Sequence, residues 1–180
     1  MRQYLAMCIL PLAAGCSTMA STENASTQNN VAFETLSADL IGADGVSVGV
    51  ATLTKRSDGI ILNVNALAST AGTFGMHLHS VGKCEGPDFA SAGGHWNPDV
   101  KQHGRDNPMG AHGGDLPNAV AGVDKKVMLE FRMPEILLKG DGGLLDADGA
   151  ALVIHEKPDD YKTDPTGNSG KRKICGVFKG

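Results

Sequence analysis

Hydrophobic and polar residues alternate along much of the chain beyond about residue 31. Apolar side chains occupy every second position over residues 46–50 and again over residues 60–64, a period of two that is typical of half-buried β-strands. Asp-Gly pairs at 44–45 and 58–59 favour tight turns beside these strands and therefore consecutive hairpins. Further strands are predicted over 31–40, 73–80, 118–123, 127–132, 151–155 and 173–178. Eight short antiparallel strands indicate an all-β fold, either a β-sandwich or a flattened barrel.

Residues 1–15 have the features of a secretory signal peptide. One arginine precedes an apolar run of about eleven residues, which fits an exported leader and is too short to span a bilayer. The run resembles a bacterial lipobox, in which the leader is cut before a cysteine, here Cys16, and the thiol is acylated. That pattern usually has leucine where this chain has Ala13, so cleavage within the following Ser/Ala/Thr stretch is the alternative. Residues 16–31 contain nothing that could form a core and predict a flexible linker, which leaves one folded domain over 32–180.

Composition and charge narrow the class of protein. The chain of 180 residues is long enough for one domain with a full hydrophobic core and too short to expect two. With 24 glycines and only 4% aromatic residues, the core must rely on aliphatic side chains and much of the backbone must lie in turns. The net charge is −4 and the Lys and Arg residues are mostly scattered, which argues against a nucleic-acid-binding surface.

The four cysteines also fit an exported protein. Cys8 would leave with the leader and Cys16 would become the lipid anchor, which leaves Cys84 and Cys175 as a natural pair in an oxidising compartment. A bridge between them would close about 90 residues and favour folding by up to roughly 4 to 5 kcal/mol through chain entropy. The chain has no Cys-x-x-Cys, which argues against a thiolate zinc site or a thioredoxin-like redox motif.

A long polar stretch, residues 82–117, interrupts the strand pattern and is rich in Gly, Pro, Asp, Asn and His. A compact domain rarely contains 36 residues of loop unless something orders them. Three histidines lie in this stretch, His95, His103 and His112, and Asp115 follows the last of them by three residues. Imidazole and carboxylate are ligands that zinc accepts, and a ring of imidazoles also suits copper. The stretch therefore predicts a loop that is ordered around metal.

The other histidines fall on predicted strands. His77 and His79 project from the same face of a strand, with Cα atoms roughly 6.5 to 7 Å apart, so two imidazoles can converge on one ion. An isolated His-x-His is more often the polar face of a half-exposed strand, and a single loop histidine is more often solvated. His155, on the strand predicted over 151–155, is the sixth histidine. Six histidines together, three of them in the long polar stretch, favour a metal site over these two alternatives.

These motifs resemble those of the copper/zinc superoxide dismutases in their exported bacterial form. The resemblance covers about residues 32–180 and rests on the segments GMHLH at 75–79, GGHWNP at 93–98, HGGDL at 112–116, VIHE at 153–156 and RKICGV at 172–177, together with Cys84 and His103. It implies an eight-stranded antiparallel Greek-key sandwich or flattened barrel with long metal-binding and electrostatic loops.

The resemblance also implies two metal sites and assigns their ligands position by position. Copper would be bound by His77, His79, His95 and His155. Zinc would be bound by His95, His103, His112 and Asp115. His95 would serve both ions as the doubly deprotonated imidazolate, an anion that two divalent cations stabilise. Asp159 matches an aspartate that hydrogen-bonds one ligand histidine of each site and fixes the orientation of both rings, although without the resemblance it is a loop turn.

The activity that the resemblance implies is the conversion of two superoxide radicals to oxygen and hydrogen peroxide through a Cu(II)/Cu(I) cycle. His95 would donate a proton in the second half of that cycle. Arg172 matches the family's anion-guiding arginine, whose permanent charge can hold superoxide beside copper. By composition alone, residues 171–173 are a solvated basic run before a strand. Candidate steering residues are Lys157, Lys162, Lys171 and Lys173.

Two other functions compete with this interpretation. One is a copper/zinc-binding module of the same fold without turnover, although known non-catalytic relatives lose copper ligands or the guiding arginine, which this chain retains. The other is a structural surface lipoprotein, which would leave the histidines and Asp115 without a role. We expect superoxide as the small-molecule partner, a periplasmic or cell-envelope location that protects the envelope, membrane contact only through lipidated Cys16, and a monomer or homodimer.

Overall fold

The computed structural model describes residues 34–133, 138–140 and 142–180. The predicted signal peptide, the lipidation site Cys16 and the linker 16–31 lie outside the described residues. Within the described part of the chain, no helix is long and apolar enough to cross a membrane.

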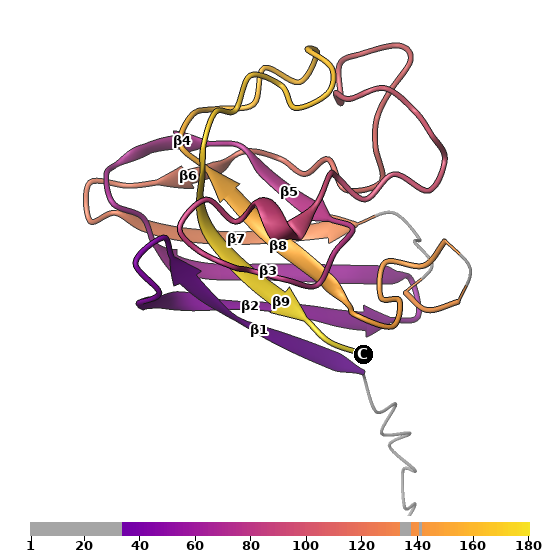
Figure 1. Ribbon diagram of the computed structural model, residues 1–180, viewed down its shortest axis with the longest axis horizontal. Coiled ribbons are helices and arrows are strands. Elements are labelled where there is room, and N and C mark those ends of the chain that lie inside the picture. The colour runs from indigo at the N-terminus through magenta and orange to yellow at the C-terminus, as the bar shows by residue number, and fades with distance from the viewer. Residues whose placement is uncertain (1–33, 134–137, 141) are drawn as a thin grey trace, which may run out of the picture. The chain divides into compact units, whose positions relative to one another are not determined.

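The described residues form one antiparallel sheet of nine strands, which confirms the all-β prediction (Figure 1). The strands are Thr35–Gly42 (β1), Ser47–Arg56 (β2), Gly59–Leu67 (β3), Gly72–Phe74 (β4), Met76–His79 (β5), Ala119–Ala121 (β6), Lys126–Met133 (β7), Ala150–His155 (β8) and Arg172–Phe178 (β9), with one 3-10 helix, Ala90–Ala92 (η1). The sheet order is β4-β6-β7-β3-β2-β1-β9-β8-β5. Because β4 and β5 are consecutive in the chain yet lie at opposite ends of this order, the sheet curls into a nearly closed, flattened Greek-key barrel.

Nine strands are present where the sequence predicted eight, because the strand expected over 73–80 is two strands. β4 pairs with β6, whereas β5 pairs with β8, so the chain crosses from one side of the barrel to the other at Gly75. The carbonyl of Gly75 accepts a hydrogen bond from the backbone N–H of His155 at 2.8 Å. A Cβ on Gly75 would lie 2.5 Å from Ser169 Oγ, so this crossing leaves no room for a side chain.

The main core is aliphatic, as the composition predicts. Alternate residues of the central strands face it, including Leu40 of β1, Leu53 of β2 and Leu62 of β3, each at most 1% exposed. Leu152 and Ile154 of β8 fill its other side. Burying such side chains fully is worth about 1.5 to 3 kcal/mol each, so the period-two pattern supplies the main driving force for the sheet.

One detail of the hydrophobic pattern is misleading. Val48 of β2 packs against the main core, but Val46 precedes β2 and is 58% exposed, and Val50 is 38% exposed. A bulge accounts for Val50, because Leu40 of β1 pairs with Gly49 while the next residue, Ile41, pairs with Ser47. The extra residue reverses which face of β2 points inward, as bulges do.

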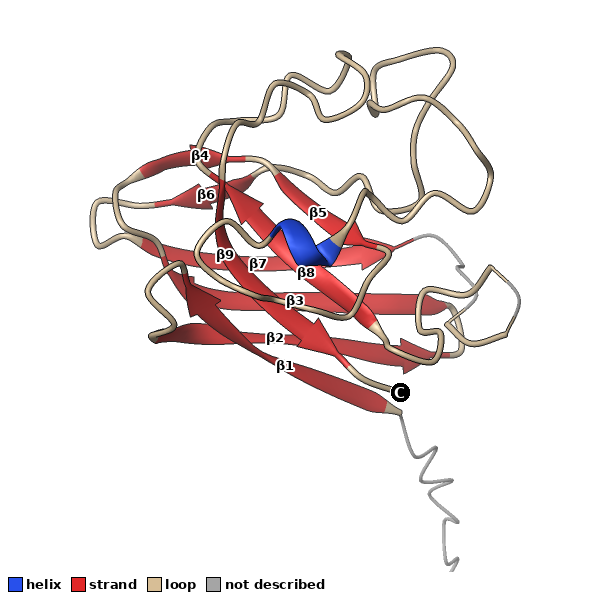
Figure 2. Ribbon diagram, viewed as in Figure 1, coloured by secondary structure: helices blue, strands red, loops and turns tan. Residues whose placement is uncertain are grey.

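A second, smaller core lies between the sheet and the beginning of the long loop. All residues of β8 are buried, because Leu152 and Ile154 pack in the main core while Ala151 and Val153 pack on the opposite face. Phe89 from the loop is fully buried in this second core. Figure 2 shows the two long loops, after β5 and after β8, on the same end of the barrel.

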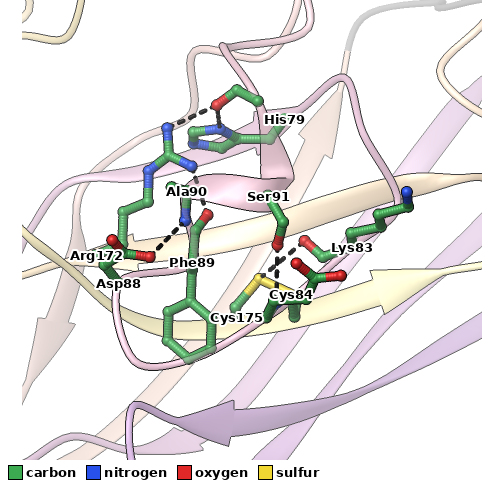
Figure 3. The surroundings of a disulfide bond; sticks show 11 residues. His79, Lys83, Cys84, Asp88, Phe89, Ala90, Ser91, Arg172 and Cys175 are labelled. Atoms are coloured by element: carbon green, nitrogen blue, oxygen red, sulfur yellow. Dashed lines mark hydrogen bonds between the residues drawn. A yellow bond between two sulfur atoms is a disulfide. The ribbon is translucent and has the colours of Figure 1, made fainter.

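The predicted disulfide is present. Cys84 and Cys175 are bonded, with Cα atoms 5.7 Å apart and a sequence separation of 91 (Figure 3). Cys175 lies in β9 and is fully buried in the second core. The bond therefore ties the first part of the long loop to the strand that begins at Arg172.

Replacing Cys84 and Cys175 by serine should lower the free energy of unfolding by about 2 to 5 kcal/mol, because the unfolded chain loses a cross-link that spans most of the domain. A shift of the urea midpoint measures this. Hydrogen exchange should rise first in residues 84–93, while the central strands keep their protection. An unchanged midpoint together with unchanged loop exchange would contradict this role of the disulfide.

Candidate metal centre

The long loop docks on β5, the edge strand that carries His77 and His79. Backbone pairing continues from the strand into the loop, because Leu78 N–H donates to Gly114 O at 2.9 Å and Trp96 N–H donates to Leu78 O at 2.8 Å. Isolated bridges also join His77 to Asp115 and His79 to His95. This pairing places the predicted loop ligands directly against the predicted strand ligands.

A first cluster contains the four histidines that the sequence assigned to copper. One ring nitrogen from each of His77, His79, His95 and His155 lies within 4.8 Å of the other three. His77 and His79 are fully buried, and His155, at the end of β8, is 3% exposed. The imidazoles of His77 and His95 stack with ring centroids 4.0 Å apart.

The second ring nitrogen of each strand histidine is held by the protein. His79 Nδ1 lies 2.9 Å from the carbonyl oxygen of Gly93, and His155 Nδ1 lies 3.1 Å from that of Gly170. Because a carbonyl can only accept, both Nδ1 atoms carry the proton and donate it. His77 Nε2 likewise donates to Asp159 Oδ2 at 2.8 Å. Each ring therefore presents an unprotonated nitrogen to the cluster.

These inward-facing nitrogens have no hydrogen-bond partner. His77 Nδ1 and the Nε2 atoms of His79, His95 and His155 are buried and unsatisfied. Leaving a buried acceptor unpaired costs about 1 to 3 kcal/mol, so four together point to a ligand between them. A metal ion that accepts four nitrogen lone pairs fits this arrangement, and imidazole suits copper.

Burial also sets the protonation state of this cluster. Removal from water lowers the pKa of His77 to about 3 and that of His155 to about 4. The same cause lowers the pKa of His79 to about 2 and places that of His95 below its usual value. The imidazoles are therefore neutral near pH 7, which is the form that binds a metal.

A second cluster surrounds Asp115. Its Oδ1 lies 3.0 Å from His95 Nδ1, 3.0 Å from His103 Nδ1 and 3.3 Å from His112 Nδ1. Ligands at 2.0 to 2.1 Å around a tetrahedral zinc ion are separated by about 3.3 Å, so these spacings suit zinc. His77 is also near this cluster, but its Nε2 already donates to Asp159, and His112 is therefore the fourth member.

The electrostatics of the second cluster are those of a cation site. Burial would lower the pKa of His103, but hydrogen bonds to Asp115 and Asp159 raise it to about 9. Burial would raise the pKa of Asp115, yet His103 and His95 lower it well below its usual range. The carboxylate is thus ionised and faces three imidazoles, a geometry that requires either a shared proton or a metal ion.

His95 joins the two clusters. Its Nδ1 lies in the second cluster, 3.0 Å from Asp115 Oδ1 and 3.3 Å from His112 Nδ1, whereas its Nε2 is one of the unsatisfied nitrogens of the first. One imidazole with a nitrogen in each cluster is what the sequence prediction of a bridging ligand requires.

Asp159 lies between the two clusters. Its Oδ2 accepts from His77 Nε2 at 2.8 Å and its Oδ1 accepts from His103 Nε2 at 3.0 Å. Asn118, which the sequence reasoning missed, fixes the backbone of Asp159 in both directions, since its Oδ1 accepts from Asp159 N and its Nδ2 donates to Asp159 O. An amide at the first position of the predicted strand 118–123 was the signal for Asn118, because it offers a donor and an acceptor together.

Arg172 lies near His79 of the first cluster, as Figure 3 shows. Its Nη1 donates to Phe89 O and its Nη2 donates to Gly93 O, each at 2.6 Å. Gly93 O also accepts from His79 Nδ1, so one carbonyl fixes both the guanidinium and a ligand histidine. Sequence reasoning missed Phe89 and Gly93, because they act through main-chain oxygens. All four candidate steering lysines are exposed, and among them Lys171 and Lys173 line a hollow next to Arg172.

A barrel with two adjoining ligand clusters that share an imidazole defines a protein that binds two metal ions. The family described as copper/zinc superoxide dismutase (SODC) matches residues 47–178. The chain belongs to the copper/zinc superoxide dismutase family, whose members are oxidoreductases with copper and zinc as cofactors.

Bacterial proteins are prominent among the relatives. "Superoxide dismutase-like protein YojM" of Bacillus subtilis (strain 168) is 43% identical over 145 residues, which is 78% of this chain and 74% of the relative. A Cu-Zn superoxide dismutase of Aquifex aeolicus (strain VF5) is 41% identical over 145 residues, 79% of this chain and 86% of the relative. The crystal structure of a SOD-like protein from Bacillus subtilis has a TM-score of 0.76 and 40% identity, covering 82% of this chain and 99% of its own.

Replacing Asp159 by asparagine should weaken binding of both metals about 10- to 100-fold. An amide has one acceptor and one donor side, so only one of the two imidazole N–H groups would keep an acceptor. Competition with a chelator, followed separately for copper and zinc, measures the loss. Asp106→Asn, at an exposed side chain in the long loop between β5 and β6, is the control and should leave both affinities unchanged. Equal affinities in Asp159→Asn and the native protein would refute the orienting role.

Proposed function

We propose that this protein is a superoxide dismutase, which converts two superoxide radicals and two protons to oxygen and hydrogen peroxide. The observation that carries this proposal is the pair of clusters joined by His95, with the guanidinium of Arg172 held beside the first. Family membership supports it, since several relatives are named Cu-Zn superoxide dismutases. Bound copper supplies a one-electron carrier that alternates between its +2 and +1 states, while zinc has no accessible redox step.

The ligand assignment is part of the proposal. His77 Nδ1 and the Nε2 atoms of His79, His95 and His155 would hold copper, since these are the nitrogens without a partner. Nδ1 atoms of His95, His103 and His112 would hold zinc together with Asp115 Oδ1. The hydrogen bonds from the opposite nitrogens to Gly93, Gly170 and Asp159 fix the rings of the strand histidines.

Arg172 would bind the substrate. Superoxide is a small anion that offers little to recognise beyond charge and size, and a guanidinium is permanently charged with several donors. Nη1 and Nη2 each already donate to a carbonyl, so the side chain is fixed in place before the anion arrives. This fixation lowers the ordering cost of binding.

His95 would also carry a proton. Its Nε2 faces the first cluster and its Nδ1 faces Asp115, so a proton held at Nε2 lies on the substrate side. Delivery of that proton in the second half of the reaction would produce peroxide rather than leave a bare dianion in a buried site.

A metal-binding module without turnover is the second candidate. The observation that favours it is the name of the 43% identical Bacillus relative, which is only superoxide dismutase-like. Against it stand the six histidines, Asp115 and Arg172, which here converge in one place. Purified protein that contains both metals yet does not consume superoxide would favour the module.

Replacing Arg172 by glutamine should lower the rate constant for superoxide consumption about 10- to 100-fold while both metals stay bound, because the anion loses its charged partner. Pulse radiolysis or stopped-flow measurement gives the rate, and metal analysis of the same sample gives occupancy. Lys179→Gln, which removes the same charge from an exposed position near the end of the chain, should have little effect. Full activity in Arg172→Gln would eliminate the guiding role.

The location in the cell envelope and the lipid anchor also remain proposals. The disulfide supports an oxidising compartment, where such bonds persist. Replacing Cys16 by serine should move the protein from the membrane fraction to the soluble fraction of the envelope, because no thiol remains for acylation. Fractionation followed by immunoblotting tests this, and a native protein that is already soluble would indicate ordinary leader cleavage.

A further inference from the structure

A hollow of about 640 Å³ opens next to Arg172. Three consecutive cations line it, Lys171 directly before β9 and Arg172 and Lys173 at the start of that strand. Neither lysine forms an ion pair with another described residue, so both charges are available to a ligand. Three cations around one small hollow create a strong site for anions in general.

Such a site would bind dianions more tightly than the monoanion superoxide. Coulomb attraction is proportional to the charge of the ligand, so a dianion is attracted about twice as strongly as a monoanion at the same place. Sulfate and hydrogen phosphate would therefore bind next to Arg172 in preference to superoxide, unless something in the hollow opposes multiple charge.

Among the described residues that line this hollow, Asp88 alone has a carboxylate side chain. Its Oδ1 accepts a hydrogen bond from the backbone N–H of Ala90 at 3.1 Å, in the turn that leads into η1. The next residue, Phe89, is fully buried and supplies the carbonyl that holds Arg172 Nη1. The carboxylate and the acceptor of the guanidinium thus belong to adjacent residues of one turn (Figure 3).

We propose that Asp88 is a specificity-determining residue that acts on anions by their charge, so that the hollow beside Arg172 favours dianions over a monoanion such as superoxide less than its three cations alone would. This inference rests on the proposed function. The repulsion that Asp88 exerts doubles for a dianion, as the attraction of the cations does. Asp88 therefore offsets part of the advantage that three cations would give to sulfate or phosphate, at a smaller loss for superoxide.

The test compares perchlorate with sulfate, which are both tetrahedral and differ by one charge. Asp88→Asn removes the carboxylate charge, and its amide oxygen can still accept from Ala90 N–H. Binding is followed by the side-chain Nε–H resonance of Arg172 in the protein loaded with zinc and reduced copper, which needs no turnover. Asp88→Asn should bind perchlorate about threefold more tightly and sulfate about ninefold more tightly, the square of the first factor.

Asp124→Asn is a matched control. Asp124 is exposed, and its Oδ1 accepts from the backbone N–H of Lys126 two residues on, at 3.2 Å, so the substitution changes the same charge in the same kind of turn. Asp124 does not line the hollow, and we expect less than about a 1.5-fold change for either anion.

Three results would overturn the proposal. They are equal tightening of both anions by Asp88→Asn, no tightening of either, and a native Arg172 resonance that responds to neither anion. Superoxide consumption is measured separately on the same samples. Charge selection without turnover would refute the proposed function and keep the inference, whereas turnover without charge selection would do the reverse.

Discussion

The pairing of the long loop with β5 is the interaction on which the metal centre depends. Without it, β5 would be an exposed edge, with Met76 and Leu78 in the main core and the imidazoles of His77 and His79 in water. The loop continues the hydrogen bonding of the sheet. The backbone N–H of Leu78 donates to Gly114 O, and the backbone C=O of Leu78 accepts from Trp96 N–H. The same pairing buries both imidazoles and brings the loop ligands against them, so secondary structure and metal geometry form together.

Most of the candidate ligand imidazoles are oriented by a hydrogen bond at the ring nitrogen that faces away from the first cluster. The partner in that hydrogen bond comes from a different part of the chain. Gly93 and Gly170 offer carbonyls to His79 and His155, and both glycines have φ values, 72° and 74°, that other residues rarely adopt. Gly167 serves in another way, because a Cβ there would lie 2.7 Å from His103 Nε2. The glycines that make the loops look unstructured in the sequence are therefore what allows the backbone to approach the ligands so closely.

The sequence offers the candidate ligands directly, because imidazole and carboxylate side chains carry their chemistry in their identity, and the resemblance assigns them to two proposed metal sites. It also predicts the strands, because burial of one face imposes a period of two. It does not predict the phase of β2, since the bulge opposite Leu40 depends on pairing between strands. Nor does it reveal Phe89 and Gly93 as supports of Arg172, because every residue has a carbonyl and only the fold shows which ones are used.

The distribution of charge explains how an anionic protein can attract an anion. The net charge is −4, yet the acids nearest the centre, Asp115 and Asp159, are buried, whereas Arg172 and its neighbouring lysines face the hollow. With the proposed ligands, two divalent ions bring four positive charges, and two carboxylates and one imidazolate remove three. The centre thus keeps about one positive charge, to which Arg172 adds another. With the proposed metals bound, buried acids would neutralise them where water is excluded, and the positive charge that remains would be presented to the proposed substrate, superoxide.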